Sequence, residues 1–442
     1  MDLLSRLGGD EALTAVFAER RLIEDWLLVE ARLAEALEAA GVIATGTGSR
    51  IAAACRYEAI DVERLWTESA NVGYPIFPLV KQICAALPAE DAAHVHYGAT
   101  TQDIMDSALA LQLRDAAARL NELLAEFGDA LAELTEAHAE TVMPGRTHAQ
   151  QAVPTTFGAK CAVFLDELTR HRTRLARARK SVSVVSLFGA GGTSAALGSA
   201  APAVRAELAR RLDLADPPVP WHVSRDRVAE LTQTAALIAA TCVRFGREII
   251  DLSRTEIAEV AEADGVYRGA SSTMPQKANP ISSELAVGFG VMAEVNAQAV
   301  LRALEVGHER AAGEWQVEWQ AVPAALIATA GSLRSVAAIA SGLRVFPERM
   351  RQNLNADGGR LMSEAYMISL AGKLGRDKAH EVVYAAVRTS REQGLPLREA
   401  VKSAAGEAIW SVVEPRLPEP EDYIGAAPQA CAAAVEAWRS RT

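Results

Sequence analysis

Aromatic side chains are scarce in this sequence: Phe, Trp and Tyr make up 5% of its 442 residues, although half of all residues are apolar. The hydrophobic core must therefore consist mainly of Ala, Leu, Val and Ile, a composition that favours close packing of helices over sheets. A chain of this length exceeds what one simple core accommodates, so two or three domains are expected.

Cysteine is also sparse, and the arrangement of the five cysteines excludes several kinds of site. Their number is odd, they lie far apart, and none forms a C-x-x-C pair. The pattern provides neither a disulfide framework nor a zinc site, and it is typical of reduced thiols in a cytoplasmic protein. Because no cofactor motif occurs either, we expect a protein that uses no metal and no cofactor.

Positive charge is in deficit, because 45 Lys and Arg residues face 56 Asp and Glu residues, and the formal net charge is −11. This balance argues against nucleic acid as a partner, and an anionic substrate requires a local cluster of basic side chains. The N-terminal segment is acidic early and lacks the long apolar core of a signal peptide. No run of 18 uncharged apolar residues occurs, so no membrane partner is expected.

Proline is absent from long stretches, which cover residues 89–143, 155–201, 221–274, 281–322 and 348–395. Apolar residues recur at helical spacings between Leu109 and Leu134, and again between Val228 and Val260. Both patterns outlast the usual globular helix, which indicates a long bundle or an oligomeric core. Because such helices expose more apolar surface than one chain covers, self-association is expected.

The sequence therefore predicts an all-α protein with three helical domains. The N-terminal domain covers residues 1–105 and begins with an amphipathic helix at 21–40, which Gly41 ends. A central domain of long helices covers 106–345, and a smaller helical domain covers 346–442.

Four polar clusters interrupt the expected helices, and the first is H-Y-G-A-T-T-Q-D at residues 96–103. Thr101 or Asp103 can act simply as a helix N-cap, whose side-chain oxygen accepts backbone N–H bonds. Alternatively, hydroxyls such as those of Thr100 and Thr101 form an anion site together with the free N–H groups of the helix start. The residues alone leave both interpretations open.

The second cluster, G-R-T-H-A-Q at residues 145–150, carries a histidine, the side chain best suited to proton transfer near neutral pH. A lone histidine is more often structural, but His148 has polar neighbours and lies in a break between long helices. The third cluster, F-G-A-G-G-T-S at 188–194, lacks the G-K-[ST] ending of a phosphate loop. A flexible or a tight glycine turn is therefore preferred to nucleotide binding.

The fourth cluster is the polar loop at residues 269–280, which reads G-A-S-S-T-M-P-Q-K-A-N-P. It places a potential base, Ser271, six residues before a cation, Lys277. A polar connector between two helices is the alternative interpretation. Basic side chains also occur in the polar segments 221–227 and 308–310. Arg225 and Arg310 are therefore further candidates for substrate binding.

These clusters resemble the signature blocks of the fumarase/aspartase superfamily. The loop at 269–280 is similar to G-S-S-x-M-P-x-K-x-N-P, and residues 145–150 are similar to G-R-T-H-x-Q. Residues 96–103 resemble H-x-G-x-T-S-x-D, with Thr101 in place of the usual Ser. The three blocks occur in the family's order, and the general resemblance extends over nearly the whole chain.

The resemblance implies an all-α homotetramer built around long central helices, with each active site taking its blocks from three subunits. It also implies a reversible β-elimination without a cofactor. A base removes the proton next to a carboxylate, an aci-carboxylate dianion forms, and a group leaves the neighbouring carbon. Ser271 matches the base, His148 the acid that protonates the leaving group in some members, and Glu284 the carboxylate that orients the histidine.

The same resemblance assigns the binding of substrate carboxylates to a larger set of polar residues. Its members, with neighbouring candidates from the same blocks, are Lys277, Asn279, Thr100, Thr101, Thr147, Gln150 and Ser272. A serine is basic only as an oxyanion, which requires backbone N–H groups and a nearby cation. The turn at Gly269 and the side chain of Lys277 are expected to supply them.

Within the superfamily, residues 73–80, 220–227, 308–310 and 314–319 are most similar to the 3-carboxy-cis,cis-muconate cycloisomerases. Bacterial cycloisomerases usually carry a large apolar residue where this chain has His148, which is typical of lyases that release fumarate. Adenylosuccinate lyase fits less well, because its substrate histidine is missing near 71–75 and its phosphate-binding serines are replaced by A-A-G-E at 311–314. A lyase on another substituted succinate and an inactive helical scaffold remain alternatives.

Overall fold

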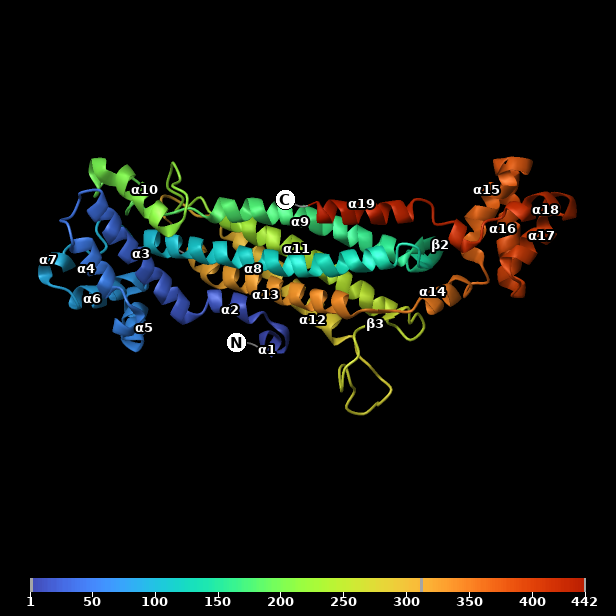
Figure 1. Ribbon diagram of the computed structural model, residues 1–442, viewed down its shortest axis with the longest axis horizontal. Helices are drawn as coiled ribbons and strands as arrows, with labels where there is room; N and C mark the ends of the chain where they lie inside the picture. The colour runs from blue at the N-terminus through green and yellow to red at the C-terminus, as the bar shows by residue number, and fades with distance from the viewer. Residues whose placement is uncertain (1–2, 311–312, 441–442) are drawn as a thin grey trace. The chain divides into compact units, whose positions relative to one another are not determined.

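The computed structural model describes residues 3–310 and 313–440, and most of them are helical (Figure 1). The chain divides into two compact units, one of residues 1–123, 171–243 and 288–334, the other of 124–170, 244–287 and 335–442. Each of the longest helices contributes residues to both units. These helices are α8 (Thr101–Ala137), α9 (Phe157–Val182), α11 (Asp226–Leu252), α12 (Ile281–Arg302) and α13 (Glu314–Gly342). The division into three domains at residues 105 and 345 stays a prediction.

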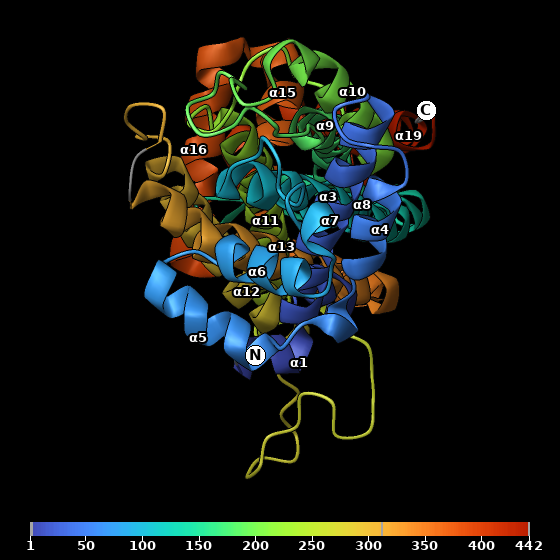
Figure 2. The same ribbon diagram turned by 90° about the vertical axis from the view of Figure 1, so that its left-hand side faces the viewer.

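The first unit also contains shorter helices, several of which are labelled in Figure 2, a view turned by 90° from that of Figure 1. They are α1 (Leu3–Gly8), α2 (Glu11–Val16), α3 (Glu19–Ala39), α4 (Thr47–Ala54), α5 (Val62–Val72), α6 (Ile76–Ala85), α7 (Ala89–Ala92) and α10 (Ala201–Leu212). Helix α3 packs against α4 and α10 around a core rich in Leu, Ile and Ala. The helix expected at 21–40 is confirmed, and Gly41 after it has a φ of 72°.

The second unit has its own short helices and its own hydrophobic cluster. They are α14 (Pro347–Leu354), α15 (Ser363–Leu374), α16 (Arg376–Gln393), α17 (Leu397–Ala405), α18 (Glu407–Val413) and α19 (Ala427–Arg439). Helix α16 packs against both α15 and α17. Trp410 and Leu370 are buried in this cluster.

The long helices pack closely, as the aliphatic composition predicts. In the first unit, a Cβ atom added at Gly290 of α12 would lie 2.3 Å from a methyl carbon of Val243 on α11. In the second unit, the ring of Phe245 lies 5.1 Å from that of Phe127 and 5.3 Å from that of Phe164, both edge to face. Small residues and a few aromatic rings therefore hold α8, α9, α11 and α12 together within the units.

Two features differ from the expectation of uninterrupted helices. Helix α11 ends at Leu252, so Ile257 and Val260, which continue its apolar pattern, lie outside it. Strands also occur: β1 (Val142–Thr147) pairs with β2 (Gln150–Thr156), and β3 (Val260–Ala261) pairs with β4 (Arg344–Val345). The segment between α8 and α9 is thus an antiparallel hairpin, and β3, between α11 and α12, pairs with β4 after α13, which the helical periodicity could not indicate.

Helix α13 is long and apolar enough to cross a membrane, judged by length and composition, with a mean hydropathy of 1.5 over its most apolar window. In the structure 72% of that window is buried, as is common for a core helix. The N-terminal residues Glu314 and Glu318 and the internal Pro323 also belong to this helix.

A buried carboxylate on α3 gives the fold a specific pH dependence. Asp25 is 3% exposed, and burial raises its pKa to about 6, although Arg21 donates to it at 2.8 and 3.0 Å. The folded pKa exceeds the unfolded one, so stability is lost as the pH rises from about 4 to about 6. At about 1.4 kcal/mol per unit of pKa difference, the ionised group costs about 3 kcal/mol.

We therefore expect Asp25→Asn to gain stability over the native protein by about 2 kcal/mol between pH 4 and pH 6.5. Urea unfolding of both proteins at several pH values gives the difference in their free energies of unfolding. The contributions of the other titrating groups, which both proteins share, cancel in this difference. A difference that is constant with pH would contradict the assignment.

Candidate active site

The polar loop at 269–280 follows β3 and leads directly into α12 (Figures 1 and 2). Its two ends are joined, because the Asn279 backbone N–H and side-chain Nδ2 both donate to the Gly269 carbonyl, at 2.8 and 3.0 Å. Gly269 has a φ of 67°, and a Cβ atom there would lie 2.3 Å from the Asn279 carbonyl oxygen. Only glycine fits this position, which explains why the loop begins with it.

Ser271 is held inside this closed loop by backbone donors. Its Oγ accepts hydrogen bonds from the N–H groups of Thr273, at 3.3 Å, and Met274, at 3.2 Å. Two such donors stabilise negative charge on the oxygen, as a serine base requires. Backbone N–H groups are therefore present, but they come from Thr273 and Met274 and not from the turn at Gly269, where the sequence predicted them. Lys277 is exposed, and its Nζ makes no ion pair with any described residue.

The base of the loop is fixed by Glu262, a residue that the sequence did not single out. Its Oε1 accepts from the N–H and the Oγ of Ser283, both at 2.8 Å, and its Oε2 accepts from the N–H of Ser282 at 3.2 Å. Arg268 donates to the Ser282 Oγ at 2.7 Å. Glu262 thus caps the N-terminus of α12 from outside the helix, and no motif in the sequence signals such a cap.

We expect Glu262→Gln to lower kcat by roughly 10²-fold, because the Gln amide opposes the N–H donors of α12 and displaces the loop. Substrate binding should change less, so kcat and KM must be measured separately. Asp264→Asn is the matched control, since that side chain is 78% exposed in the same segment. A kcat within twofold of the native value would show that the loop does not depend on Glu262.

His148 lies at the tip of the β1–β2 hairpin. Thr147 pairs with Gln150, which leaves His148 and Ala149 as a two-residue turn with φ values of 49° and 60°. Two positive φ values are typical of a type I′ turn, where Asn and Gly are usual. All four of these residues are exposed. The side chain of His148 is therefore exposed at the tip of the hairpin.

The hairpin is anchored behind its tip by a buried ion pair. Arg146 donates to both oxygens of Glu259, at 2.8 and 2.6 Å, and Glu259 is fully buried. Asn353 donates to Glu259 at 2.8 Å, and Gln151 donates to the Asn353 carbonyl at 2.9 Å. A bidentate pair with these extra bonds fixes the direction of the turn that carries His148.

The start of α8 is organised by Asp103, which is fully buried. This carboxylate accepts from His222 Nε2 at 2.7 Å, from the N–H groups of Phe188 and Gly189 at 3.0 and 2.8 Å, and from the Thr100 N–H at 3.1 Å. Burial raises its pKa, but these donors lower it below the usual value. Asp103 thus fixes the glycine turn at 188–194, which is the tight one of the two alternatives expected there.

Thr100 and Arg310 are brought together beside this helix start. Arg310 Nε donates to Gln102 Oε1 at 2.7 Å, and its Nη1 lies 3.4 Å from the Thr100 hydroxyl. Its Nη2 is buried and has no hydrogen-bond partner among the described residues. A cation, a hydroxyl and the free N–H groups that begin at Thr101 are suited to a carboxylate. Ala311 and Ala312, which the comparison with adenylosuccinate lyase used, lie outside the described residues.

Arg225 is placed differently from Arg310. It is 2% exposed, and its guanidinium donates to Asp106 at 2.8 Å and to both oxygens of Glu318 at 2.5 to 3.2 Å. Two carboxylates occupy its donors, so the arrangement favours a positioning role over direct contact with substrate.

The candidate residues therefore gather in separate groups. The loop holds Ser271, Ser272, Lys277 and Asn279, the hairpin holds Thr147, His148 and Gln150, and the start of α8 holds Thr100 and Thr101 with Arg310. Glu284 lies exposed in the first turn of α12 and, within the described chain, makes no hydrogen bond or ion pair with His148. Their roles in catalysis stay predictions.

Comparison with known proteins gives the family. Residues 9–295 match the model of the Lyase family. The chain is 40% identical to a 3-carboxy-cis,cis-muconate cycloisomerase of Pseudomonas aeruginosa, covering 94% of this chain and 92% of that one. It is 35% identical to an N-acetyl-S-(2-succino)cysteine lyase of Dickeya dadantii, covering 95% and 93%. The crystal structure of the 3-carboxy-cis,cis-muconate lactonizing enzyme from Pseudomonas putida matches with a TM-score of 0.92 at 35% identity, covering 99% of each chain.

These similarities extend over nearly the full length of the chain and include the segments that carry all three sequence blocks. They confirm the all-α fold class, with the two strand pairs as local additions. The chain therefore belongs to the lyase family within the fumarase/aspartase superfamily, and it is a lyase or cycloisomerase of that superfamily.

Proposed function

We propose that this enzyme interconverts 3-carboxy-cis,cis-muconate, or a closely related tricarboxylate, with its lactone, and that Ser271 is the base. The observation that carries the proposal is the pair of backbone N–H groups on Ser271 Oγ, at 3.2 and 3.3 Å, in a loop closed by Gly269 and Asn279. The 40% identity to a cycloisomerase supports the choice of substrate.

The proposed reaction opens the lactone by elimination. Ser271 takes the proton next to a substrate carboxylate, and the electron pair moves into that carboxylate to form the aci-carboxylate. The lactone C–O bond then breaks and a double bond forms. The departing group is itself a carboxylate, which leaves as an anion and needs no proton. Lys277 and the Thr100–Arg310 pair are proposed to hold the substrate carboxylates.

A panel of substrates tests this proposal. We expect loss or gain of conjugated absorbance with 3-carboxy-cis,cis-muconate and its lactone, at a kcat/KM at least 10²-fold above that for adenylosuccinate, argininosuccinate or N-acetyl-S-(2-succino)cysteine. Preference for one of the substituted succinates would overturn the choice of substrate. A separate assay tests the proton removal that all active members of the superfamily share: exchange of a succinate proton with deuterated solvent. If no dicarboxylate exchanges a proton, the alternative of an inactive scaffold is favoured.

A second function is favoured by one residue. His148 is retained, and a lyase that releases fumarate from a substituted succinate needs an acid when its leaving group is an amine or a thiolate. The relative that cleaves N-acetyl-S-(2-succino)cysteine supports this alternative. Exposure of His148 at the hairpin tip leaves its imidazole available for proton transfer.

The variant His148→Gln separates the two functions. If the leaving group is a lactone carboxylate, kcat should fall less than about tenfold, whereas loss of an essential acid lowers it roughly 10²- to 10⁴-fold. Stopped assays on the best substrate of the panel give the ratio. A large loss with the lactone would contradict the carboxylate leaving group, and Ala149→Gly controls for general disturbance of the turn.

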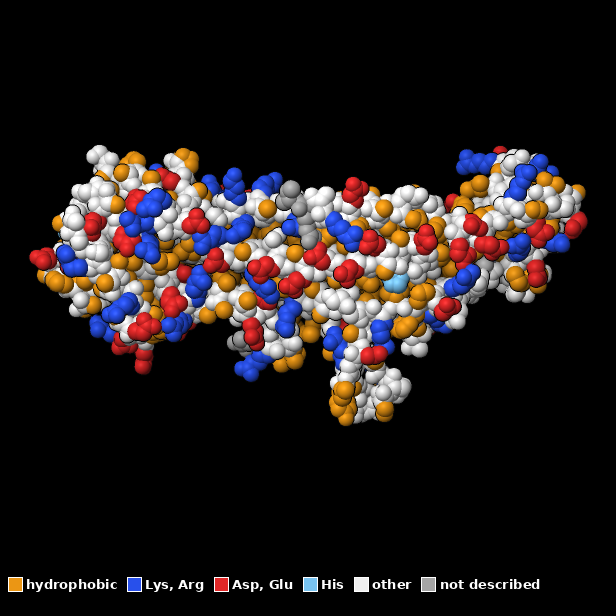
Figure 3. Space-filling view, viewed as in Figure 1, with side chains coloured by type: hydrophobic (Ala, Val, Ile, Leu, Met, Phe, Trp, Pro, Cys, Tyr) orange, Lys and Arg blue, Asp and Glu red, His pale blue; other side chains and the backbone are white. Residues whose placement is uncertain are grey.

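The proposed assembly is a cytoplasmic homotetramer whose subunits share active sites. Exposed apolar side chains on α11 and α12 support association: Leu237 is 50%, Met292 47% and Val295 58% exposed. Figure 3 also shows apolar side chains on the segment between β3 and α12, residues 262–280. In this segment Val266 is 90% and Tyr267 is 89% exposed. Five free cysteines, three of them buried, support a reducing compartment.

A further inference from the structure

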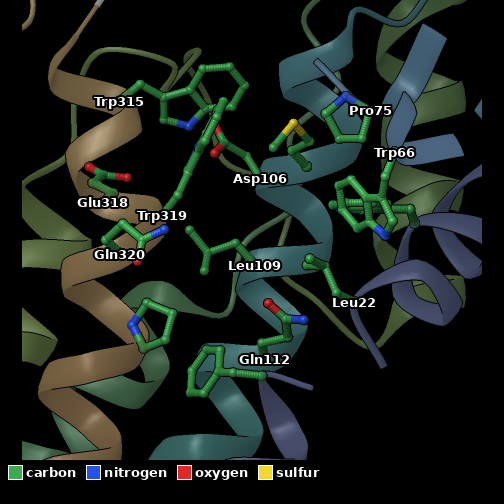
Figure 4. Close-up of a pocket in the computed structure, with 14 residues that line it drawn as sticks. Leu22, Trp66, Pro75, Asp106, Leu109, Gln112, Trp315, Glu318, Trp319 and Gln320 are labelled. Atoms are coloured by element: carbon green, nitrogen blue, oxygen red, sulfur yellow. The ribbon is translucent and has the colours of Figure 1, made fainter. Parts of the chain in front are cut away.

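A cavity of about 290 Å³ lies in the first unit between α3, α5, α8 and α13 (Figure 4). Four of the chain's seven tryptophans line it: Trp26, Trp66, Trp315 and Trp319. The Trp315 and Trp319 rings meet edge to face at 5.1 Å, and the Trp26 and Trp66 rings do so at 6.2 Å. In a chain so poor in aromatic residues, this concentration of indole rings is a distinct chemical environment.

The charged groups of the cavity wall are both acidic. Asp106 and Glu318 line it, and the one guanidinium that pairs with them, that of Arg225, is shared between the two. Two carboxyl groups thus share one guanidinium, so the cluster has one acidic group in excess of its cations. Asp106 Oδ2 accepts from Arg225 at 2.8 Å, but its Oδ1 is buried and has no hydrogen-bond partner among the described residues.

This excess acidic group decides what the cavity accepts. An anion would meet Asp106 and Glu318 in a poorly solvated site, so the carboxylates of the proposed substrate are excluded from it. Burial raises the pKa of Asp106, although Arg225 lowers it, so one guanidinium does not fully offset the burial of this carboxyl group. A cation against the indole faces would supply further positive charge, and it would gain about 0.5 to 2 kcal/mol from the rings.

We propose that this cavity binds a small organic ammonium ion, with the ammonium beside the wall that holds the carboxyl groups of Asp106 and Glu318 and the apolar tail lying against the tryptophan rings. The volume suffices, because an apolar cavity of about 150 Å³ in another protein holds a benzene ring. The site is distinct in chemistry from the proposed substrate site, which takes carboxylates. The proposed function therefore does not depend on it.

The test uses 2-phenylethylammonium as the probe, with 2-phenylethanol as its neutral and phenylacetate as its anionic counterpart. Binding to the full-length enzyme is followed by tryptophan fluorescence and calorimetry. We expect the ammonium ion to bind at least about tenfold more tightly than the alcohol, which corresponds to 1.4 kcal/mol, and phenylacetate to leave the fluorescence unchanged. Equal affinity for all three probes, or no binding of the ammonium ion, would overturn the proposal.

Two variants locate the site. Leu109→Trp fills the cavity from α8 and should abolish calorimetric binding of the ammonium ion while turnover stays unchanged, since Leu109 lines this cavity and belongs to none of the three groups of candidate site residues. Asp106→Asn should reduce the preference for ammonium over alcohol to within about threefold. Undiminished binding in Leu109→Trp would place the probe elsewhere and contradict the inference. If Asp106→Asn fails to fold, the comparison of the three probes in the native enzyme still decides the outcome.

Discussion

Replacing Ser271 by alanine should lower kcat roughly 10³-fold or more and leave the fold intact, because the variant loses the group that removes the proton. The Ser271 side chain is small and only half-buried, and its Oγ accepts hydrogen bonds from the N–H groups of its own loop. Circular dichroism and thermal unfolding should therefore match the native protein. Turnover of the best substrate, followed by conjugated absorbance, gives the ratio.

Ser272→Ala is the matched control for this loss, because the neighbouring serine is exposed in the same loop. Its effect should be far smaller, since substrate binding by one hydroxyl is worth less than the base. Activity of Ser271→Ala within tenfold of the native value would remove Ser271 from the mechanism. An equal loss in both variants would show that disturbance of the loop, and not the base, limits turnover.

The same variant tests whether active sites are shared. Ser271 and Arg310 lie in separate groups of candidate residues, and within the described chain no hydrogen bond or ion pair joins them. If different subunits supply Ser271 and the proposed carboxylate-binding Arg310 to one site, mixing inactive Ser271→Ala with inactive Arg310→Ala, unfolding and refolding them together should restore part of the activity. No recovery, with mixed oligomers verified by mass, would contradict the shared site.

The sequence predicted the chemistry of the loop better than its geometry. The S-S-x-M-P block identified Ser271, and the sequence also predicted a turn at Gly269. The structure gives the reason for the glycine, because a Cβ atom at this position would collide with the Asn279 carbonyl oxygen. The hairpin that carries His148 was missed, because β1 and β2 are short and lie between helices whose periodicity dominates the pattern. Its turn also has His and Ala where Asn and Gly are usual, so no turn signal was visible.

Residues that position others were the hardest to predict. Glu262 and Asp103 act by accepting several backbone N–H groups from segments 20 and 85 residues away, and such long-range contacts leave no spacing in the sequence. Arg225 was expected among the substrate-binding cations because a basic residue in a polar segment resembles one. Arg225 is instead buried between Asp106 and Glu318, which are 119 and 93 residues away in the sequence, so no local pattern indicates its burial.

Replacing Arg225 by leucine should destabilise the protein by about 3 to 5 kcal/mol, the largest effect on stability that we expect from one side chain. The Arg225 guanidinium is 1% exposed, pairs with Asp106 and Glu318 at 2.8 and 2.5 Å, and lies 4.9 Å from the centre of the Trp221 ring. Its removal leaves two buried carboxylates facing each other without a cation. Thermal and urea unfolding measure the loss.

Arg177→Leu is the control, because that side chain is 74% exposed and pairs with Glu230 at 2.8 Å on the surface. It should change stability by no more than about 1 kcal/mol. A second variant separates unpaired charge from lost packing: adding Asp106→Leu and Glu318→Leu to Arg225→Leu removes every charge of the cluster. Buried ion clusters replaced in this way are often as stable as the original. Recovery in the triple variant would therefore show that Arg225 neutralises these two carboxylates, whereas a loss that persists would mean that the guanidinium acts mainly by packing against Trp221.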